Sequence, residues 1–344
     1  MSGNGGALQS LQDVNKQLIS RLEGAGIQSI SDLATTTPYE LLEDYHSNYD
    51  DVIKGIDFET ISQLVLKARQ KLIEDGLLQR DFYSAEKMLE IREKLIKFTT
   101  GSQSFDSFLG GEIETQALTE IVGEFGSGKS QLCYTLCVTA NMSDKDCGII
   151  FVDTENSFRV ERVHQIAESK GLDAEKIMKK INVCKIYYSS HLEAAIRTLA
   201  KYIEKYKARL IIIDSIISLH RAEFAGRETL VERQQRLNMI LHKLKRLAEV
   251  YNVAIVYTNQ IQAQPNDTFP SNGFDSIRAA GGNIMGHTST YRIFLRKAGH
   301  NRIGIILDSP YHPYSQVKFT IGEEGIQDLE KKDSRAAVGN ECGW

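Results

Sequence analysis

The chain has 344 residues, of which 42% are hydrophobic and 25% are charged, and its formal net charge is −4. This length suffices for more than one domain with a sizeable core, and the composition is ordinary for a soluble globular protein. No apolar run approaches the ~18 residues of a spanning helix, and residues 1–10 lack the basic-then-apolar pattern of a signal peptide, so we expect an intracellular protein without a membrane partner. The slightly acidic balance does not by itself indicate nucleic-acid binding, although loops and backbone amides can still hold phosphates locally.

Residues 1–76 are predicted to form a small helical domain. Apolar residues recur at helical spacing over 11–22 and 60–73, and Gly24 and Gly26 lie where the first helix would stop. Residues 1–80 hold 12 acidic and 7 basic residues, a net charge of −5, and the acidic run 44–51 is expected to be a solvated loop. Residues 77–98 follow as a linker, whose second part, 85–98, has helical character.

Residues 99–330 show the alternation of short apolar strands with amphipathic helices that is typical of a parallel α/β domain. Strands are predicted over 117–122, 148–153, 182–186, 210–214 and 253–258, and their nearly continuous apolarity predicts burial on both faces. Three later runs, 288–295, 302–308 and 316–321, have short connections and are predicted to add antiparallel strands at one edge. Residues 331–344 are predicted to be a disordered tail.

A phosphate-binding loop is predicted over residues 123–130, which match G-x-x-x-x-G-K-[ST] at every fixed position, between an apolar run and a helix-like run at 131–139. Its glycines let backbone N–H groups face the phosphates, and the following helix points its positive end at the same anion. Lys129 is predicted to reach the β- and γ-phosphates of ATP, and the Ser130 hydroxyl to ligate Mg²⁺. The residues predicted to hold the nucleotide here are Gly123, Glu124, Phe125, Gly126, Ser127, Gly128, Lys129, Ser130 and Gln131.

Polar side chains follow three of the predicted strands. Asp214 ends the apolar run 210–214, which is the Walker B arrangement, and is predicted to lie beside the metal. Glu155 follows another strand and can orient the attacking water, the alternative being that it only caps its loop. Gln260 follows a third, where a neutral amide can sense whether the γ-phosphate is present.

Taken together, the segments 98–102, 123–131, 153–162, 225–234, 258–260, 281–283 and 307–310 resemble the RecA-type recombinases, on the branch of archaeal RadA and its eukaryotic relatives. The resemblance implies a RecA-like P-loop ATPase core, a mostly parallel α/β sheet with antiparallel edge strands, behind a helix-hairpin-helix-like domain. It implies a DNA-dependent ATPase that uses ATP and Mg²⁺, polymerises on single-stranded DNA, and exchanges homologous strands in double-strand break repair. The implied partners are single- and double-stranded DNA, further copies of the chain in a helical filament or ring, and recombination mediators. The implied location is with the chromosome: in the cytoplasm if the protein is archaeal, which Gly126-Ser127 in the loop favours, and in the nucleus if it is eukaryotic.

The resemblance also implies roles for individual residues at the nucleotide. Glu155 would activate water with Lys129 on the phosphates, Gln260 would be the γ-phosphate sensor, and His287 would be a second reporter of nucleotide state. Arg162 would lie along the adenine.

Contacts between protomers are implied at two places. Asp308 and Pro310 would cap the ATP of the neighbouring protomer. Phe82 and Ala85 match the family's F-x-x-A polymerisation element, in which both side chains fill pockets on the next protomer; taken alone, they also fit a hydrophobic helix start.

Two segments would bind DNA, 221–233 and 262–282. Their candidate residues are Arg221, Arg227 and Arg233 in the first, and Arg278, Gly281 and Gly282 in the second. From the residues alone, a solvated helix start with surface arginines is the better interpretation of the first segment. The second segment, about twenty residues without periodicity, indicates function or disorder. The chain departs from the family at Glu228, where relatives commonly carry glycine, and in the hairpins 11–16 and 53–57, which have fewer glycines than the family pattern. DNA contact by the N-terminal domain therefore stays open.

Two other functions fit part of the pattern. One is a paralogue or mediator that binds ATP and regulates filament assembly without exchanging strands. The other is a hexameric helicase or clock-type ATPase of the same fold, against which the linker element and Asp308 argue.

Overall fold

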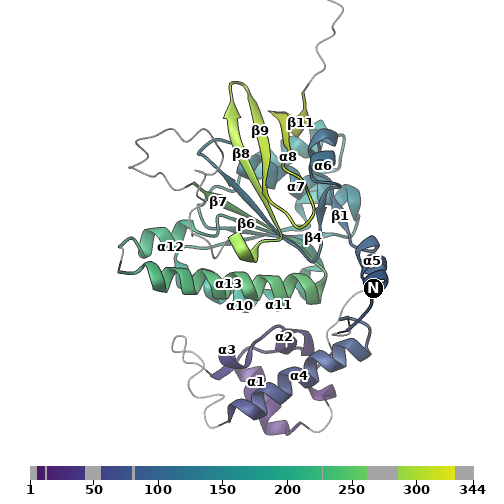
Figure 1. The fold of residues 1–344 in the computed structure, drawn as a ribbon, viewed down its shortest axis with the longest axis vertical. Coiled ribbons are helices and arrows are strands. Elements are labelled where there is room, and N and C mark those ends of the chain that lie inside the picture. The colour runs from purple at the N-terminus through teal and green to yellow at the C-terminus, as the bar shows by residue number, and fades with distance from the viewer. Residues whose placement is uncertain are drawn as a thin grey trace, which may run out of the picture.

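The computed structural model describes residues 6–11, 14–42, 56–79, 82–226, 228–261 and 286–329. The predicted tail, 331–344, and the segment 262–282 lie outside the described residues. The described residues form a group of N-terminal helices below a large sheet that carries helices on both faces (Figure 1). No helix in this part of the chain has the length and apolarity to cross a membrane.

The N-terminal helices are α1 (Lys16–Gly24), α2 (Ile30–Ala34), α3 (Pro38–Leu42) and α4 (Phe58–Glu74), preceded by a 3-10 turn, η1 (Leu8–Ser10). The helix predicted from residue 11 begins later because Asn15 is its N-cap, its side chain accepting a hydrogen bond from the Gln17 N–H at 2.8 Å. It ends at Gly24, as the two glycines predicted. The helix predicted over 60–73 is confirmed as α4, whose buried residues lie on one face: Ile61, Leu64, Val65, Ala68 and Leu72.

The linker helix α5 (Ala85–Glu93) is shorter than predicted. Ser84 caps it, accepting from the Lys87 N–H at 3.1 Å, and no residue between Ala85 and Glu93 is buried. The predicted extension to residue 98 is wrong: β1 (Lys97–Phe98) pairs antiparallel with β2 (Ile113–Glu114), and Phe98 is fully buried. A buried aromatic residue in a strand thus overrides helical propensity at this end of the linker. Helix α6 (Gln103–Phe108) follows.

The main sheet has nine strands in the order β11-β10-β9-β8-β3-β7-β6-β4-β5. Their bounds are β3 (Leu118–Gly123), β4 (Gly148–Asp153), β5 (Ile181–Lys185), β6 (Ala208–Asp214), β7 (Ala254–Gln260), β8 (Tyr291–Ala298), β9 (Asn301–Asp308), β10 (Gln316–Gly322) and β11 (Gly325–Asp328). Neighbours from β8 to β5 are parallel, and β9, β10 and β11 are antiparallel additions.

Two predictions about the sheet are wrong. The run 288–295 contains β8, which lies parallel to β3, with Ile293 opposite Ile121. β7 ends at Gln260, opposite the last residue of β3, and β8 begins at Tyr291, opposite Thr119 near the start of β3, as a parallel crossover requires. Burial on both faces holds for β3 and β4 but not for β5, the edge strand, which has no fully buried residue.

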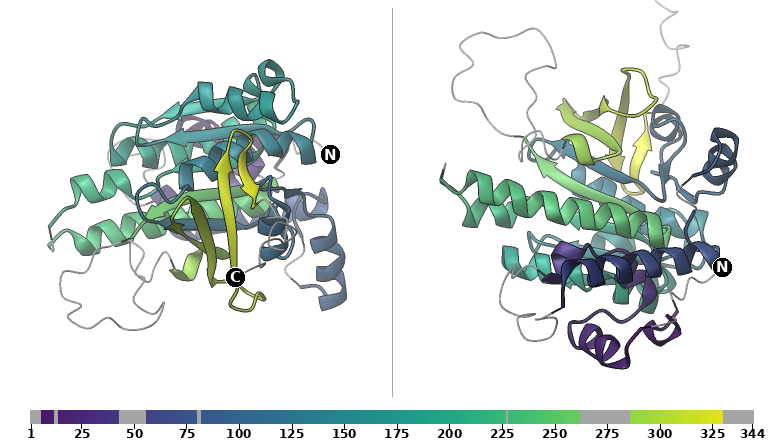
Figure 2. Two further views of the ribbon diagram at one scale, coloured as in Figure 1. Left: turned by 90° about the horizontal axis from the view of Figure 1, so that it is seen from above. Right: turned by 60° about the horizontal axis from the view of Figure 1, so that its bottom comes forward.

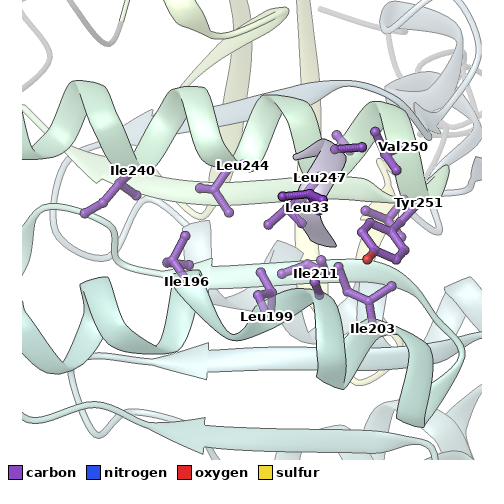
Figure 3. Packing of buried hydrophobic residues seen from close by; sticks show 14 of the residues in the cluster. Leu33, Ile196, Leu199, Ile203, Ile211, Ile240, Leu244, Leu247, Val250 and Tyr251 are labelled. Carbon is purple, nitrogen blue, oxygen red and sulfur yellow. The ribbon is translucent and has the colours of Figure 1, made fainter. Parts of the chain in front are cut away.

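Helices cover both faces of the sheet. On one face lie α7 (Lys129–Ser143), α8 (Val160–Ser169) and α9 (Ala174–Met178); on the other lie α10 (Ser189–Arg197), α11 (Leu199–Tyr206) and α13 (Leu230–Tyr251). Alternate residues of one strand serve the two cores: Phe151 packs with the α7 side and Val152 with the α13 side. Figure 3 shows the second core, in which Leu244 and Leu247 of α13 face the side chains of α10 and α11, and Leu33 of α2 joins them.

The N-terminal helices contact α13 through buried polar groups as well. Lys243 is 6% exposed, and its Nζ donates to Thr35 Oγ1 at 3.2 Å and Thr36 Oγ1 at 3.0 Å. Asp32 Oδ1 lies 4.0 Å from the same Nζ. Burial lowers the pKa of Lys243 and raises that of Asp32. Arg246 adds a hydrogen bond to the Thr35 carbonyl at 2.7 Å, so directional contacts fix the N-terminal helices to α13. Figure 2 (right) shows these helices on the α13 side of the sheet.

Candidate nucleotide and DNA site

Four parallel strands in the interior of the sheet, β3, β7, β6 and β4, have their carboxyl ends side by side. We refer to this end of the strands as the carboxyl edge of the sheet. Gly123 of β3 lies opposite Gln260 of β7, and Asp153 of β4 lies opposite Asp214 of β6. The loop after β3, Glu155 after β4, and the ends of β6 and β7 are therefore neighbours. This edge is where ligands bind in open α/β sheets.

The loop after β3 forms a cradle that requires glycine where the backbone passes close to other atoms or has a positive φ. A Cβ at Gly123 would lie 2.4 Å from Ser127 Oγ and 2.5 Å from the Leu295 carbonyl oxygen. Gly128, with φ of 107°, is the N-cap of the fifteen-residue helix α7, and no side chain caps its first turn. Backbone N–H groups at such a helix start are donors for an anion. The cradle therefore fits the phosphates of a nucleotide, while Phe125 beside it is 97% exposed.

Lys129 and Ser130, at the start of α7, add side-chain groups to the phosphate cradle. Lys129 Nζ donates to the carbonyl oxygens of Gly123 and Glu124, both at 2.9 Å, so the ammonium lies over the loop. Burial lowers the pKa of Lys129, and the carboxylates of Asp214 and Glu155 act against that shift. The Ser130 hydroxyl donates to Asp214 Oδ2 at 2.6 Å. A hydroxyl and a carboxylate side by side are hard oxygen ligands, which suit Mg²⁺ when phosphate and water supply the others.

Asp214 is held by neighbours on two other elements. Burial raises its pKa, while hydrogen bonds from Ser130 and from Thr258 Oγ1 lower it. The sequence pattern assigned no role to Thr258 or Ser215, although each is close in the chain to a residue that it did assign.

A series of hydrogen bonds connects the carboxyl ends of these strands to residues 221–233, the first segment predicted to bind DNA. Glu155 Oε1 accepts from Ser215 Oγ at 2.7 Å and from Gln260 Nε2 at 3.3 Å. Gln260 Oε1 in turn accepts from Arg221 Nη1 at 3.2 Å. Arg221 lies in the last turn of α12 (Ser218–Glu223). A side chain predicted to bind DNA is thus linked through one glutamine to the glutamate predicted to activate water.

Of the other predicted DNA residues, Arg233 lies within the part of the chain that the structure describes. Arg233, in the first turns of α13, donates to the Phe224 carbonyl at 3.1 Å. Arg227, Arg278, Gly281 and Gly282 lie outside the described residues.

Arg162 of α8 lies between the start of α7 and the β10–β11 turn. Its Nε donates to Gln131 Oε1 at 2.8 Å and its Nη2 to the Gly322 carbonyl at 2.5 Å. Burial lowers the pKa of this guanidinium. The side chain is therefore oriented beside the phosphate cradle, at its α8 side.

Asp308, Pro310 and His287 lie at the opposite end of the sheet. Asp308 pairs with Arg292 near the start of β8, and Arg292 is opposite Glu120, three residues before Gly123. At ~3.3 Å per residue, Asp308 lies about 10 Å from Gly123 along the strands, and it is two strands away across the sheet. Pro310 shares a pocket with Asp308, and the exposed His287 precedes β8 at the same end.

Phe82 and Ala85 lie on the surface of the linker. Phe82 is 94% exposed, and Ala85 is the exposed first residue of α5. The described structure therefore gives the Phe82 ring almost no contact within its own chain.

The fold and this edge define the chain as a P-loop ATPase of the RecA type, with a helical region ahead of a mostly parallel sheet and antiparallel strands at one side. The sequence model of the Rad51 family matches residues 91–329. Over 329 residues the chain is 40% identical to the "DNA repair and recombination protein RadA" of Cenarchaeum symbiosum (strain A), an alignment that covers 94% of this chain and 79% of that protein. The chain belongs to the Rad51 family, and both the predicted resemblance and the predicted fold class are confirmed.

Proposed function

We propose that this member of the Rad51 family is a recombinase: a DNA-dependent ATPase that assembles on single-stranded DNA and exchanges homologous strands in repair. Family membership supports the activity. The mechanism rests on the two hydrogen bonds that link Arg221 to Gln260 and Gln260 to Glu155. They connect a cation that faces DNA to the residue that activates water for ATP hydrolysis.

At the nucleotide, backbone N–H groups of the loop 123–130 at the start of α7 and the Lys129 ammonium bind the phosphates of ATP. Ser130 and Asp214 hold Mg²⁺, which neutralises charge on the phosphates. Glu155 accepts a proton from, or orients, the water that attacks the γ-phosphate. Arg162 lies along the adenine, on the α8 side of the cradle.

At the DNA, a backbone phosphate competes with Gln260 for the Arg221 guanidinium. Release of Gln260 changes its contact with Glu155, so that DNA binding sets the rate of hydrolysis. Further phosphate contacts come from Arg227, Arg233, Arg278, Gly281 and Gly282. Phosphate contacts carry no sequence information, which suits a protein whose DNA partner is read by base pairing.

Between protomers, Asp308 and Pro310 cap the ATP of a neighbour, and His287 reports its state from the same end of the sheet. Their distance from the cradle of their own chain supports this role in trans. Phe82 and Ala85 dock on the next protomer, which the 94% exposure of Phe82 supports. A contact of this kind between unlike surfaces propagates a filament or closes a ring.

The nucleotide roles are tested by ATPase and ATP-binding assays with single-stranded DNA. Glu155→Gln is expected to bind ATP normally and to lose at least about 100-fold in turnover, the lower end of what general-base catalysis contributes. Lys129→Ala is expected to lose nucleotide binding or turnover. Turnover that persists in Glu155→Gln would remove Glu155 from its role.

A further inference from the structure

Helix α5 contacts the core through a charged residue in its last turn. No side chain between Ala85 and Glu93 is fully buried, and Ile91 is half-buried; the helix lies to one side of the main sheet (Figure 1). Arg92, 42% exposed at its side chain, reaches the core: its Nη2 donates to both carboxylate oxygens of Glu114, each at 3.1 Å.

Glu114 in turn contacts the main sheet through Tyr291. Its side chain is 6% exposed, and its Oε1 also accepts from the Tyr291 hydroxyl at 2.5 Å. Tyr291 is the first residue of β8. A nearly buried carboxylate needs both partners, since an unpaired charge at such a site is costly.

The same arginine lies over the last residue of β9 and the segment that joins β9 to β10; we term residues 308–315 the cap loop. The Arg92 guanidinium carbon is 5.9 Å from the centroid of the Tyr311 ring, and Tyr311 meets the Tyr291 ring edge to face at 6.2 Å. The His312 ring packs against Tyr311 with centroids 4.0 Å apart and planes tilted by 37°, and its Nδ1 shares a hydrogen bond of 2.7 Å with Ser309 Oγ. Ser309 lies between Asp308 and Pro310 in the chain.

We propose that Arg92 is a positioning residue that couples the docking helix to the cap loop, so that seating Phe82 on one neighbour fixes Asp308 and Pro310 for the ATP at a subunit boundary. This inference rests on the proposed function, because the capping role of Asp308 is part of it. Arg92 lies two turns after the docking element on one short helix and contacts the cap loop through Tyr311. Loss of Arg92 therefore removes the contact through which the helix and the loop are joined.

The test measures kcat and the apparent KM for ATP at saturating single-stranded DNA. Loss of one cation–π contact and one half-exposed ion pair predicts that Arg92→Ala raises the KM for ATP about threefold to tenfold, with kcat within about twofold of the unchanged chain. Tyr311→Ala, which cuts the same link from the loop side, is expected to raise KM similarly. Arg92→Lys keeps the charge and is expected to recover part of the loss.

Lys87→Ala is the matched control, because Lys87 is a cation of the same helix whose ion-pair partner, Glu90, is on that helix. It should leave KM unchanged, and thermal unfolding checks that each variant is folded. In an Asp308→Ala background, Arg92→Ala should add nothing further. If Asp308→Ala raises KM and Arg92→Ala and Tyr311→Ala do not, or if the double variant is additive, the coupling is overturned while the capping role stands. If Asp308→Ala itself leaves KM unchanged, the capping role fails, and the inference fails with it.

Discussion

Arg221→Ala tests whether DNA binding controls hydrolysis through Gln260. The bond from Arg221 Nη1 to Gln260 Oε1 is 3.2 Å long, involves a charged donor and is exposed. An exposed bond of this kind contributes about 0.5–1 kcal/mol, which corresponds to a change of about two- to fivefold in how often Gln260 stays in place. Gln260 Nε2 donates a hydrogen bond to Glu155 Oε1 in this arrangement. When Gln260 moves away, this oxygen should become available to the attacking water. We therefore expect the ATPase rate without DNA to rise about two- to fivefold, and the stimulation by DNA to fall by the same factor.

The assay is steady-state ATP hydrolysis with and without saturating single-stranded DNA. Arg197→Ala is a suitable control for the loss of one positive charge, because Arg197 lies on α10 and its ion-pair partner, Glu193, is on that helix too. The control should show unchanged rates in both conditions. Suppose that Arg221→Ala binds DNA more weakly but keeps both the ATPase rate without DNA and its maximal stimulation by DNA. Arg221 would then be only a phosphate contact, and control of hydrolysis through Gln260 would be refuted.

Three further predictions concern assembly and stability. Phe82→Glu should give a folded but largely monomeric protein by light scattering, since a ring that is 94% exposed adds little to its own chain; an unchanged assembly size would remove the docking role. Lys243→Met should lower the free energy of unfolding in urea by about 2–4 kcal/mol, because Asp32 and the threonine hydroxyls lose a buried partner, and adding Asp32→Asn should restore part of it; equal stability of Lys243→Met and the unchanged chain would contradict this. Burial tends to raise the pKa of Asp328, but hydrogen bonds led by that from Ser102 outweigh it and lower the pKa below the ordinary 3.8. The stability this carboxylate adds is therefore present above pH ~4 and lost as pH falls through its folded pKa, so the Tm deficit of Asp328→Asn should shrink in acid; a deficit that stays constant to pH 3 would refute this.

The strands and the phosphate loop were predictable because their signals are local. Runs such as 148–153 and 210–214 are apolar throughout and end in a carboxylate, and a parallel sheet brings such ends to one edge. The loop 123–130 has fixed spacing, and Gly123 is required by the close approach of Ser127 and of the Leu295 carbonyl. Residues far apart in the chain can therefore be assigned to one site from their sequence pattern alone.

What the sequence did not predict depends on contacts between distant residues. β8 runs parallel to β3 because it begins at the end of the sheet where β3 also begins. The apolar pattern of residues 288–295 does not indicate at which end of the sheet the strand starts. The end of α5 depends on Phe98 being drawn into the core, and β11 is only four residues long. Gln260 was predicted as a sensor, but its bond to Arg221, 39 positions away, has no local signature, and neither has the burial of Lys243 against Thr35.

The central claim is that this ATPase exchanges homologous strands, and joint-molecule formation tests it most directly. Single-stranded DNA and a homologous duplex should give joint molecules when the protein, Mg²⁺ and ATP are all present. Omission of ATP, a heterologous duplex or the Lys129→Ala variant should each abolish them. A protein that binds and hydrolyses ATP on single-stranded DNA yet forms no joint molecules would contradict the account, and would instead fit a paralogue that regulates assembly.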